Sequence, residues 1–193
     1  MLDLETLGLC KNAVITRIAA VAFDMSTGDI TDEIDILVNA RSGVEAGLKI
    51  EGSTVEWWLK QDEKTIDDTF IRSIKEGHPL REALQNFTSW IDKLKKTHDS
   101  YNVMVWGNGA CADNTWIISA YNACRMEVPW KFYQDRDLRT LVYLGELLTG
   151  TSHKKARKFE GERHNPLDDC RHQVAYAVET MKAIYAKQTQ QTL

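Results

Sequence analysis

The sequence lacks the features that place a protein in a membrane or hold it on a polyanion through overall charge. No apolar run approaches the roughly 20 residues that a membrane-spanning helix needs. Asp3 and Glu5 stand where a secretory signal would carry basic residues. The net charge of −4 argues against bulk electrostatic binding of nucleic acid, although not against a local grip. We therefore expect a cytoplasmic protein with no membrane partner.

Cysteine is scarce and scattered along the chain. The four cysteines show no C-x-x-C spacing and have no histidine nearby at metal-ligand spacing. This usage indicates reduced thiols, mostly buried, in a cytosolic protein. The four are Cys10, Cys111, Cys124 and Cys170.

The composition fits one soluble domain that spans residues 1–193. A hydrophobic fraction of 43% is enough for a sizeable core, and 27% charged residues is ordinary for a globular protein. Six tryptophans are many for this length, which suggests that some do more than pack.

The order of periodic segments predicts an α/β protein with a mixed sheet and helices packed on it. Strands come first, because the apolar runs after residue 13 are β-branched or alternate with polar residues. Helical stripes and one further strand follow. The expected strands are the first residues, 14–24, 30–39 and 101–106; the expected helices are 55–60 capped by Ser53 or Thr54, 62–76, 80–95, 113–125, part of 138–148, and 166–187.

Two carboxylates two residues apart open the chain, in the stretch MLDLETLG. On a strand, Asp3 and Glu5 project to one face and Leu2 and Leu4 to the other. Neighbouring anions repel unless a cation lies between them, and carboxylate oxygens suit Mg²⁺ or Mn²⁺. The alternative is two solvated charges at a ragged end. Strands usually run about 5–6 residues, so this strand is either unusually short or the numbering begins inside a longer chain.

Two later segments could complete such a site. Asp113 follows a short apolar strand and a Gly-x-Gly turn, at the start of a helix, where a plain N-cap is the alternative. In HNPLDDC, Asn165 is a good N-cap, which places Asp169 in the first helical turn and His164 just outside it. A helix-dipole acid and a solvated loop histidine are the alternatives there.

In combination these segments resemble the DEDDh branch of the DnaQ-like 3′–5′ exonucleases. The resemblance rests on DLETLG, WGNGACADN and HNPLDDC and covers nearly the whole chain in element order. The wording DLETLG and the Trp57-Trp58 pair are most similar to phage and prophage members that resemble phage exonuclease A.

The resemblance implies an RNase H-like fold: a mixed five-stranded sheet, its first three strands antiparallel and the DLETLG strand central, with helices on both faces. It implies two divalent ions, Mg²⁺ or Mn²⁺, about 3.5–4 Å apart on the scissile phosphate. Asp3 would bridge the ions, Glu5 and Asp169 would complete one site, and Asp113 would bind chiefly the other. His164 would deprotonate the attacking water, because imidazole titrates near neutral pH.

The expected substrate is a single-stranded 3′ end, with DNA slightly favoured over RNA. By analogy, the N–H groups of Thr6 and Leu7 meet the 3′ hydroxyl, and the Leu7 side chain wedges against the terminal base. Trp57 or Trp58 stacks on a base, while core packing is the alternative for at least one of them. The polar segment 151–163 supplies local positive charge, through Lys154, Lys155, Arg157, Lys158 and Arg163; a solvated loop is the alternative.

Two other functions compete with the exonuclease. A catalytically silent module that binds nucleic acid or a polymerase could use the same fold, but the intact set of acids and His164 argue against it. An acidic metal-buffering or structural protein leaves the His-x4-Asp spacing and the basic segment unexplained. A homodimer is a weak expectation.

Overall fold

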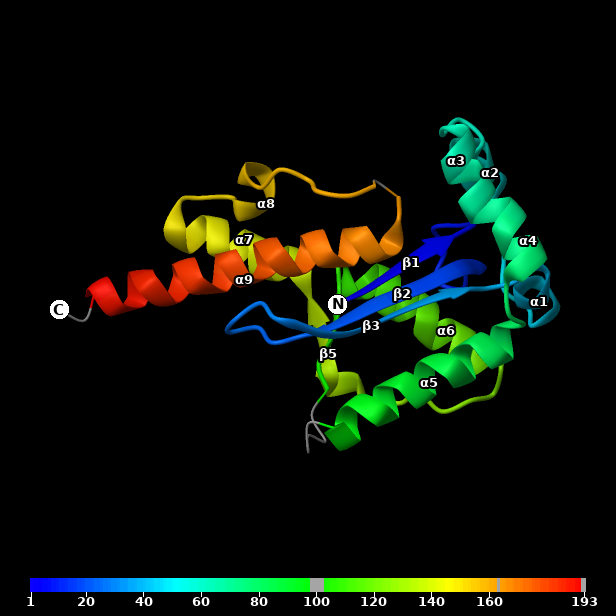
Figure 1. Cartoon of the computed structure of the whole chain (residues 1–193), viewed down its shortest axis with the longest axis horizontal. Helices are drawn as coiled ribbons and strands as arrows, with labels where there is room; N and C mark the ends of the chain where they lie inside the picture. Colours follow the sequence, from blue (N-terminus) through cyan, green and yellow to red (C-terminus); the bar gives the residue numbers. More distant parts are fainter. Residues whose placement is uncertain (98–102, 163, 192–193) are drawn as a thin grey trace.

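Five strands form one mixed sheet in the computed structural model, which describes residues 1–97, 103–162 and 164–191. The strand order β3-β2-β1-β4-β5 places β1 at the centre (Figure 1). The first three strands pair antiparallel, and β4 and β5 continue the sheet in parallel. The strands are β1 (Leu2–Thr6), β2 (Ile15–Phe23), β3 (Ile30–Leu37), β4 (Val105–Gly107) and β5 (Asp135–Asp137).

Helices cover both faces of this sheet, as the sequence predicted (Figure 1). Leu2 and Leu4 of β1 point into the core cluster under α5 and α6. The opposite face, which carries Asp3 and Glu5, lies under α9, and α7 packs beside α9. The helices are α5 (Leu80–Thr97), α6 (Thr115–Ala123), α7 (Leu138–Thr149), α8 (His153–Ala156) and α9 (Pro166–Gln191).

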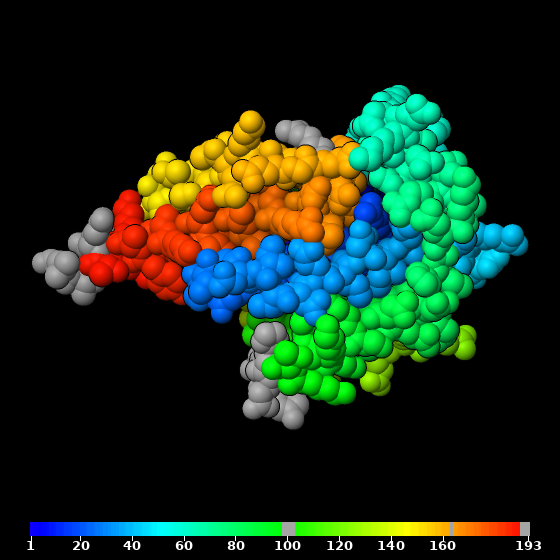
Figure 2. Space-filling view, viewed as in Figure 1, coloured from blue at the N-terminus to red at the C-terminus, as the bar shows by residue number. Residues whose placement is uncertain are grey.

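A helical arm stands at the end of the sheet where β1 finishes (Figure 1). Lys64 of the arm binds Glu162, just before the start of α9, at 2.6 Å. In the space-filling view, the dark-blue N-terminal segment shows in a hollow between the orange start of α9 and the cyan arm (Figure 2). The arm follows α1 (Ala40–Glu45) and comprises α2 (Gly52–Trp58), α3 (Glu63–Ile66), the π-helical segment η1 (Asp67–Ile71) and α4 (Arg72–Glu76).

Several element boundaries differ from the sequence-based expectation. Helix α2 begins at Gly52, so the expected Ser53 or Thr54 cap is wrong; Glu51 precedes the helix, and its carboxylate instead accepts the N–H groups of Leu9 and Cys10. Strand β4 covers only Val105–Gly107, because its ladder to β5 is confined to those residues; residues 101 and 102 lie outside the described part.

Three more boundaries are shifted. The helix expected at 113–125 begins as a π-helical turn, η2 (Ala110–Asn114), and continues as α6. The extended piece expected within residues 138–148 lies before that range, as β5. It follows the short helix η3 (Phe132–Gln134). The basic segment contains the single-turn helix α8. Cys124 and Cys170 are buried as expected, whereas Cys111 is exposed.

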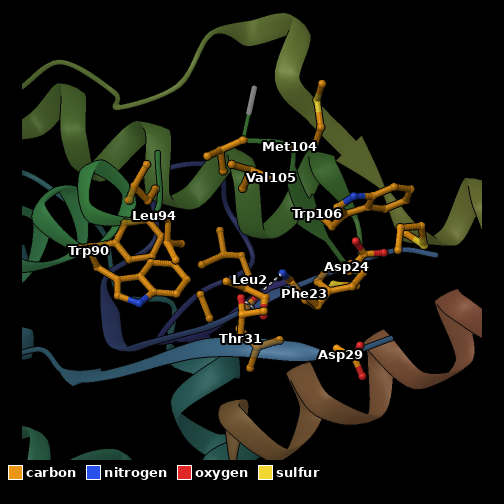
Figure 3. A pocket seen from close by; sticks show the side chains of 18 of the residues that line it. Leu2, Phe23, Asp24, Asp29, Thr31, Trp90, Leu94, Met104, Val105 and Trp106 are labelled. Atoms are coloured by element: carbon orange, nitrogen blue, oxygen red, sulfur yellow. Dashed lines mark hydrogen bonds between the residues drawn. The ribbon is translucent and has the colours of Figure 1, made fainter. Parts of the chain in front are cut away.

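An apolar pocket of about 630 Å³ lies at the amino end of β1 (Figure 3). Its lining includes Phe23 at the end of β2, Val105 of β4 and Trp90 of α5. The lining residues of this pocket do not include the carboxylates that the sequence singles out, which are Asp3, Glu5, Asp113 and Asp169.

In the described part of the chain, none of the helices combines the length and the hydrophobicity that a membrane-spanning helix needs.

Candidate active site

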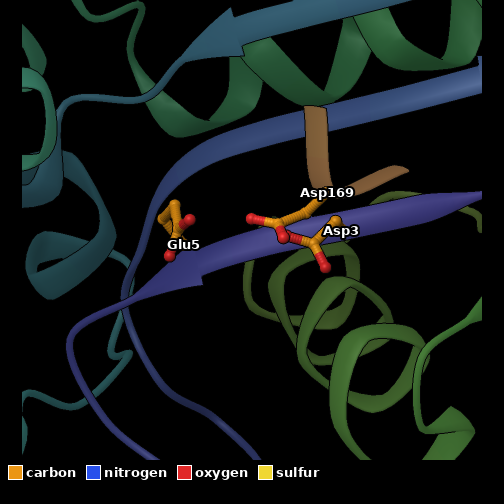
Figure 4. Close-up of side chains that lie close together, drawn as sticks. All are labelled: Asp3, Glu5 and Asp169. Atoms are coloured by element: carbon orange, nitrogen blue, oxygen red, sulfur yellow. The ribbon is translucent and has the colours of Figure 1, made fainter. Parts of the chain in front are cut away.

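Three carboxylates from two distant parts of the chain meet above the centre of the sheet. One oxygen each from Asp3, Glu5 and Asp169 lies within 4.8 Å of the other two (Figure 4). Strand alternation sends Asp3 and Glu5 to the α9 face of β1. Asp169 comes from the first turn of α9, which Asn165 caps by accepting the N–H groups of Leu167 and Asp168.

Asp113 joins this group from the turn after β4. It is buried, and its Oδ1 accepts the N–H of Leu4, the residue between Asp3 and Glu5, at 3.3 Å. Strand β1 pairs with β4 only at Leu2, so the N–H of Leu4 finds a side chain instead of a ladder partner. Asp113 thus lies against the strand that carries the first two acids. We call Asp3, Glu5, Asp113 and Asp169 the acid cluster.

The turn that delivers Asp113 needs a glycine. A Cβ on Gly107 would lie 2.3 Å from Asn114 Oδ1 and 3.1 Å from Asp113 Cβ, so a larger residue would push the turn away from β4. Asn114 holds the turn from the other side by donating to Val105 O and to Asp135 Oδ1. A π-helical turn at this place is typical of functional sites, where it re-aims a side chain.

Burial and mutual repulsion make the acid cluster a poor place for negative charge. The pKa of Glu5 is raised to about 8 by burial and then by Asp169, while Arg17 opposes the shift. Burial, followed by the charges of Asp113, Glu5 and Asp169, raises the pKa of Asp3 well above its usual value. Burial also raises the pKa of Asp113 to about 6, against its backbone hydrogen bonds and Arg139.

Oxygen donors in this arrangement fit a divalent cation. Hard cations such as Mg²⁺ and Mn²⁺ take carboxylate oxygens, and a cation removes the repulsion that raises these pKa values. Arg17 lies opposite Glu5 in the pairing of β1 with β2. It does not fill this role alone, because its Nε and Nη2 donate to the carboxylate of Asp35, at 2.8 and 2.6 Å. Sequence reasoning missed Arg17, although an arginine within an otherwise apolar strand was a signal.

His164 lies on the surface just before α9, with a left-handed φ of 63°. Its ring meets Trp57 edge-on, with ring centroids 5.3 Å apart, and Trp58 at 6.1 Å. Asp168 holds the preceding segment by accepting the N–H of Glu162, and Arg171 binds Asp168 in turn. The first acid of the Asp-Asp pair, Asp168, therefore anchors the histidine segment, while the second, Asp169, enters the acid cluster.

The two adjacent tryptophans have different surroundings. Trp58 is 3% exposed, and its indole N–H donates to Thr6 O at 2.9 Å, which fixes the arm to the end of β1. Trp57 is 45% exposed beside His164. The expectation that at least one of them packs in the core is confirmed, since Trp58 does.

Other expected substrate contacts are positioned less openly. The N–H of Leu7 donates to Val14 O, and its side chain is buried, so this N–H is not available to a 3′ hydroxyl while the turn is kept. Thr6 is buried, with its hydroxyl donating to Gly8 O. The contacts of Thr6 and Leu7 with a terminal nucleotide stay predictions.

The basic segment, which from here means residues 151–162, lies along α7 and α9 (Figure 1). Lys155 binds Glu146 at 3.4 Å, and Arg157 binds Glu179. The Lys154 ammonium lies over the Tyr176 ring at 5.9 Å and lines a small pocket of about 190 Å³ together with Arg139. Arg163, the last expected contact, lies outside the described residues.

A protein-family model matches the sequence of this chain, and solved structures share its fold. The model of the 3′-5′ exoribonuclease Rv2179c-like domain matches residues 1–181. The crystal structure of the nuclease domain of 3′hExo, a DEDDh family member bound to rAMP, has a TM-score of 0.62 and 13% identity, over 94% of this chain and 90% of that chain. The crystal structure of a full-length 3′-exonuclease has a TM-score of 0.57 and 13% identity, over 94% of this chain and 80% of that chain. No curated protein sequence matches the chain.

Proposed function

Because this chain belongs to the family of Rv2179c-like 3′-5′ exoribonuclease domains and is a 3′-5′ exonuclease, we propose that the acid cluster is its active site and a single-stranded 3′ end its substrate. The observation that carries the proposal is the convergence of Asp3, Glu5 and Asp169 within 4.8 Å, with Asp113 bonded to the strand between the first two. Four acids in one place, without enough basic partners, suit a cation-assisted phosphodiester hydrolysis.

We propose that the acid cluster holds two Mg²⁺ or Mn²⁺ ions. Asp3, at the centre of the cluster, would contact both ions; Glu5 and Asp169 would complete one site, and Asp113 would serve chiefly the other. When bound, such ions supply positive charge for the phosphate and the leaving oxygen. The carboxyl groups would be ionised when the cations bind, and their oxygens are held in place by the strand, the capped helix and the π-helical turn.

His164 is the proposed general base. An imidazole nitrogen would take a proton from the attacking water as the new O–P bond forms and the bond from phosphorus to the 3′ oxygen of the preceding nucleotide breaks. The terminal nucleotide would then leave as a 5′-monophosphate. The surface position of His164, just before α9 and beside Trp57 of the arm, supports this role.

The proposed substrate contacts are graded by their surroundings. Trp57 presents an exposed ring for stacking on a base, and Lys154 lines the small pocket beside α9 together with Arg139. Thr6, Leu7, Lys155 and Arg157 are proposed as supporting contacts. Sequence analysis favoured DNA without naming a residue that reads the 2′ position; the family description, an exoribonuclease, now favours RNA in our proposal.

Degradation of end-labelled strands tests the proposal. Wild-type protein with Mg²⁺ or Mn²⁺ should shorten 5′-labelled RNA, and DNA of the same sequence, from the 3′ end. Asp3→Ala should abolish degradation, and His164→Ala should slow it roughly 10²–10⁴-fold; His153→Ala, a histidine on α8, is the control. Products shortened from the 5′ end, or an Asp3→Ala variant as active as wild type, would contradict it. Binding without cleavage would indicate a silent nucleic-acid or polymerase-associated module.

Two further proposals follow from the sequence rather than from contacts. The wording of DLETLG and the Trp57-Trp58 pair support kinship with the phage and prophage subgroup around phage exonuclease A. A homodimer stays a prediction, which sedimentation velocity checks by giving a mass near 44 or 22 kDa, twice or once the chain mass of 22.0 kDa.

A further inference from the structure

One buried amide reaches the acid cluster without belonging to it. Gln173 lies on α9 four residues after Asp169, so both side chains are on the same face of the helix. Its side-chain amide is buried, with the residue 5% exposed, and Nε2 donates to Asp3 Oδ1 at 2.8 Å. The contact links α9 directly to the central strand.

The amide has little else to do in the fold. Among the described residues, Gln173 Oε1 is buried and accepts no hydrogen bond, so the hydrogen bonding of this side chain is directed at Asp3. Leaving a buried carbonyl oxygen unpaired costs free energy. A residue retained for packing alone would do better as a leucine or methionine, which bury no polar atom.

A neutral donor suits this position for an electrostatic reason. A lysine or arginine at residue 173 would bring a permanent positive charge to Asp3 and compete with a divalent cation for the acid cluster. An amide occupies one oxygen of the Asp3 carboxylate and fixes the carboxylate plane without adding charge. Partners that orient metal-binding side chains in this way typically contribute 10–100-fold to metal affinity or activity.

We propose that Gln173 is a positioning residue, which holds Asp3 Oδ1 and thereby orients the Asp3 carboxylate for divalent-cation binding. The inference rests on the proposed function of the acid cluster and extends it to a residue outside the acids and the histidine.

The test compares Gln173→Met, which keeps the length of the side chain but removes the donor, with wild type. Two Mn²⁺ concentrations are measured as midpoints: the one that gives half of the maximal rise in melting temperature, and the one that gives half of the maximal rate of RNA or DNA degradation. We expect both midpoints to rise 10–100-fold in the variant, with much of the activity regained at saturating Mn²⁺. Gln173→Leu is a second variant, and Thr180→Val is the matched control, because Thr180 is buried on α9 and its hydroxyl bonds Tyr176 O.

The outcomes separate this inference from the proposed function. Wild-type protein that Mn²⁺ neither stabilises nor activates would overturn the proposed function itself. Wild-type midpoints retained in Gln173→Met or Gln173→Leu would overturn only the role of Gln173. Metal-free melting of both variants far below that of Thr180→Val would show that Gln173 holds the fold, and would also overturn it.

Discussion

The acid cluster and the basic segment carry opposite charge in opposite ways. In the acid cluster, burial raises the pKa values of Asp3, Glu5 and Asp113, and neighbouring carboxylates raise those of Asp3 and Glu5 further. In the basic segment, Lys155 and Arg157 already bind Glu146 and Glu179 on the protein's own surface. The acid cluster has too few cationic partners within the protein, so its carboxyl groups can all ionise only when an external cation binds. The charges of the basic segment are largely paired within the protein.

This contrast changes the weight of the two regions in function. Lys155 and Arg157 are already paired with Glu146 and Glu179, so we expect the basic segment to attract the substrate only modestly. Unbalanced buried acids are costly to the fold and are retained for what they bind. We therefore expect substitutions in the acid cluster to dominate activity and those in the basic segment to have small effects.

The largest effect separates two adjacent acids on α9. Asp169→Asn should lower activity at least about 10³-fold, roughly 4 kcal/mol, because it removes a carboxylate from the acid cluster. Asp168→Asn should cost less than about 10-fold, since Asp168 accepts the N–H of Glu162 and an amide oxygen can still accept it. Single-turnover degradation of labelled RNA measures both. Equal losses of activity in the two variants would contradict the assignment of Asp169 to the active site and of Asp168 to holding the preceding segment.

The next effect separates the two tryptophans. Trp57→Ala should weaken binding of single-stranded nucleic acid by about 1–3 kcal/mol, the usual worth of a stacked base, with the melting temperature unchanged. Trp58→Phe should lower stability by about 1 kcal/mol, or roughly 2–4 °C in melting temperature, because it loses the bond to Thr6 O. Fluorescence anisotropy and thermal unfolding give the two readouts. A Trp57→Ala variant that binds as wild type does would remove stacking from the account.

The pH dependence of stability tests the stored charge without substrate. A carboxyl group with a raised folded-state pKa holds its proton in the folded protein and loses it in the unfolded chain, so stability falls as pH rises between the two values. For Glu5 this window runs from the ordinary pKa of 4.5 to about 8, and for Asp113 from 3.8 to about 6.

Metal-free protein should accordingly melt at lower temperature at pH 8 than at pH 5. Glu5→Gln should melt above wild type at pH 8, by about 2–4 °C for each kcal/mol recovered, and should show a smaller loss over this range. Differential scanning calorimetry in the presence of EDTA makes the comparison. A wild-type melting temperature that rises from pH 5 to pH 8 would mean that the acids are balanced within the protein.

The smallest effect concerns the basic segment. Lys154→Ala should raise KM a few-fold at low salt and less at higher salt, because Lys154 lies in no ion pair among the described residues. Lys155→Ala should change KM less, since Lys155 is shared with Glu146. Initial rates at two salt concentrations give the comparison. A tenfold rise in KM for Lys155→Ala would show that the ion pair with Glu146 opens and that Lys155 binds the substrate.

Local sequence patterns predicted the strands and the faces on which the acids lie, whereas the five-stranded sheet and the joint site of the four acids followed from the family resemblance. Alternation placed Asp3 and Glu5 on one face, and the Asn165-Pro166 helix start placed Asp169 in the first turn of α9. The π-helical turn that delivers Asp113 was not predicted, because it depends on the close contact of Gly107 with Asn114 rather than on periodicity. The Gln173 contact was missed, although its spacing from Asp169 puts both on one helix face.

Pairing between distant residues was the other limit. The basic segment was expected to be free for substrate, but Glu146 on α7 and Glu179 on α9 bind it, and nothing local in residues 151–162 indicates these partners. The helix cap at Ser53 or Thr54 was wrong because Glu51, fixed by the loop after β1, starts the helix earlier. Such contacts are set by the fold as a whole.

The most direct test of the central claim is a calorimetric titration of wild-type protein with Mn²⁺ near pH 7, in two buffers of different ionisation enthalpy. If buried, mutually repelling carboxyl groups bind the cation, saturable binding will release protons to the buffer, and Asp3→Asn will bind more weakly and release fewer. The account would be contradicted if Mn²⁺ showed no saturable binding. It would also be contradicted if Mn²⁺ bound without releasing protons and Asp3→Asn bound it as wild type does.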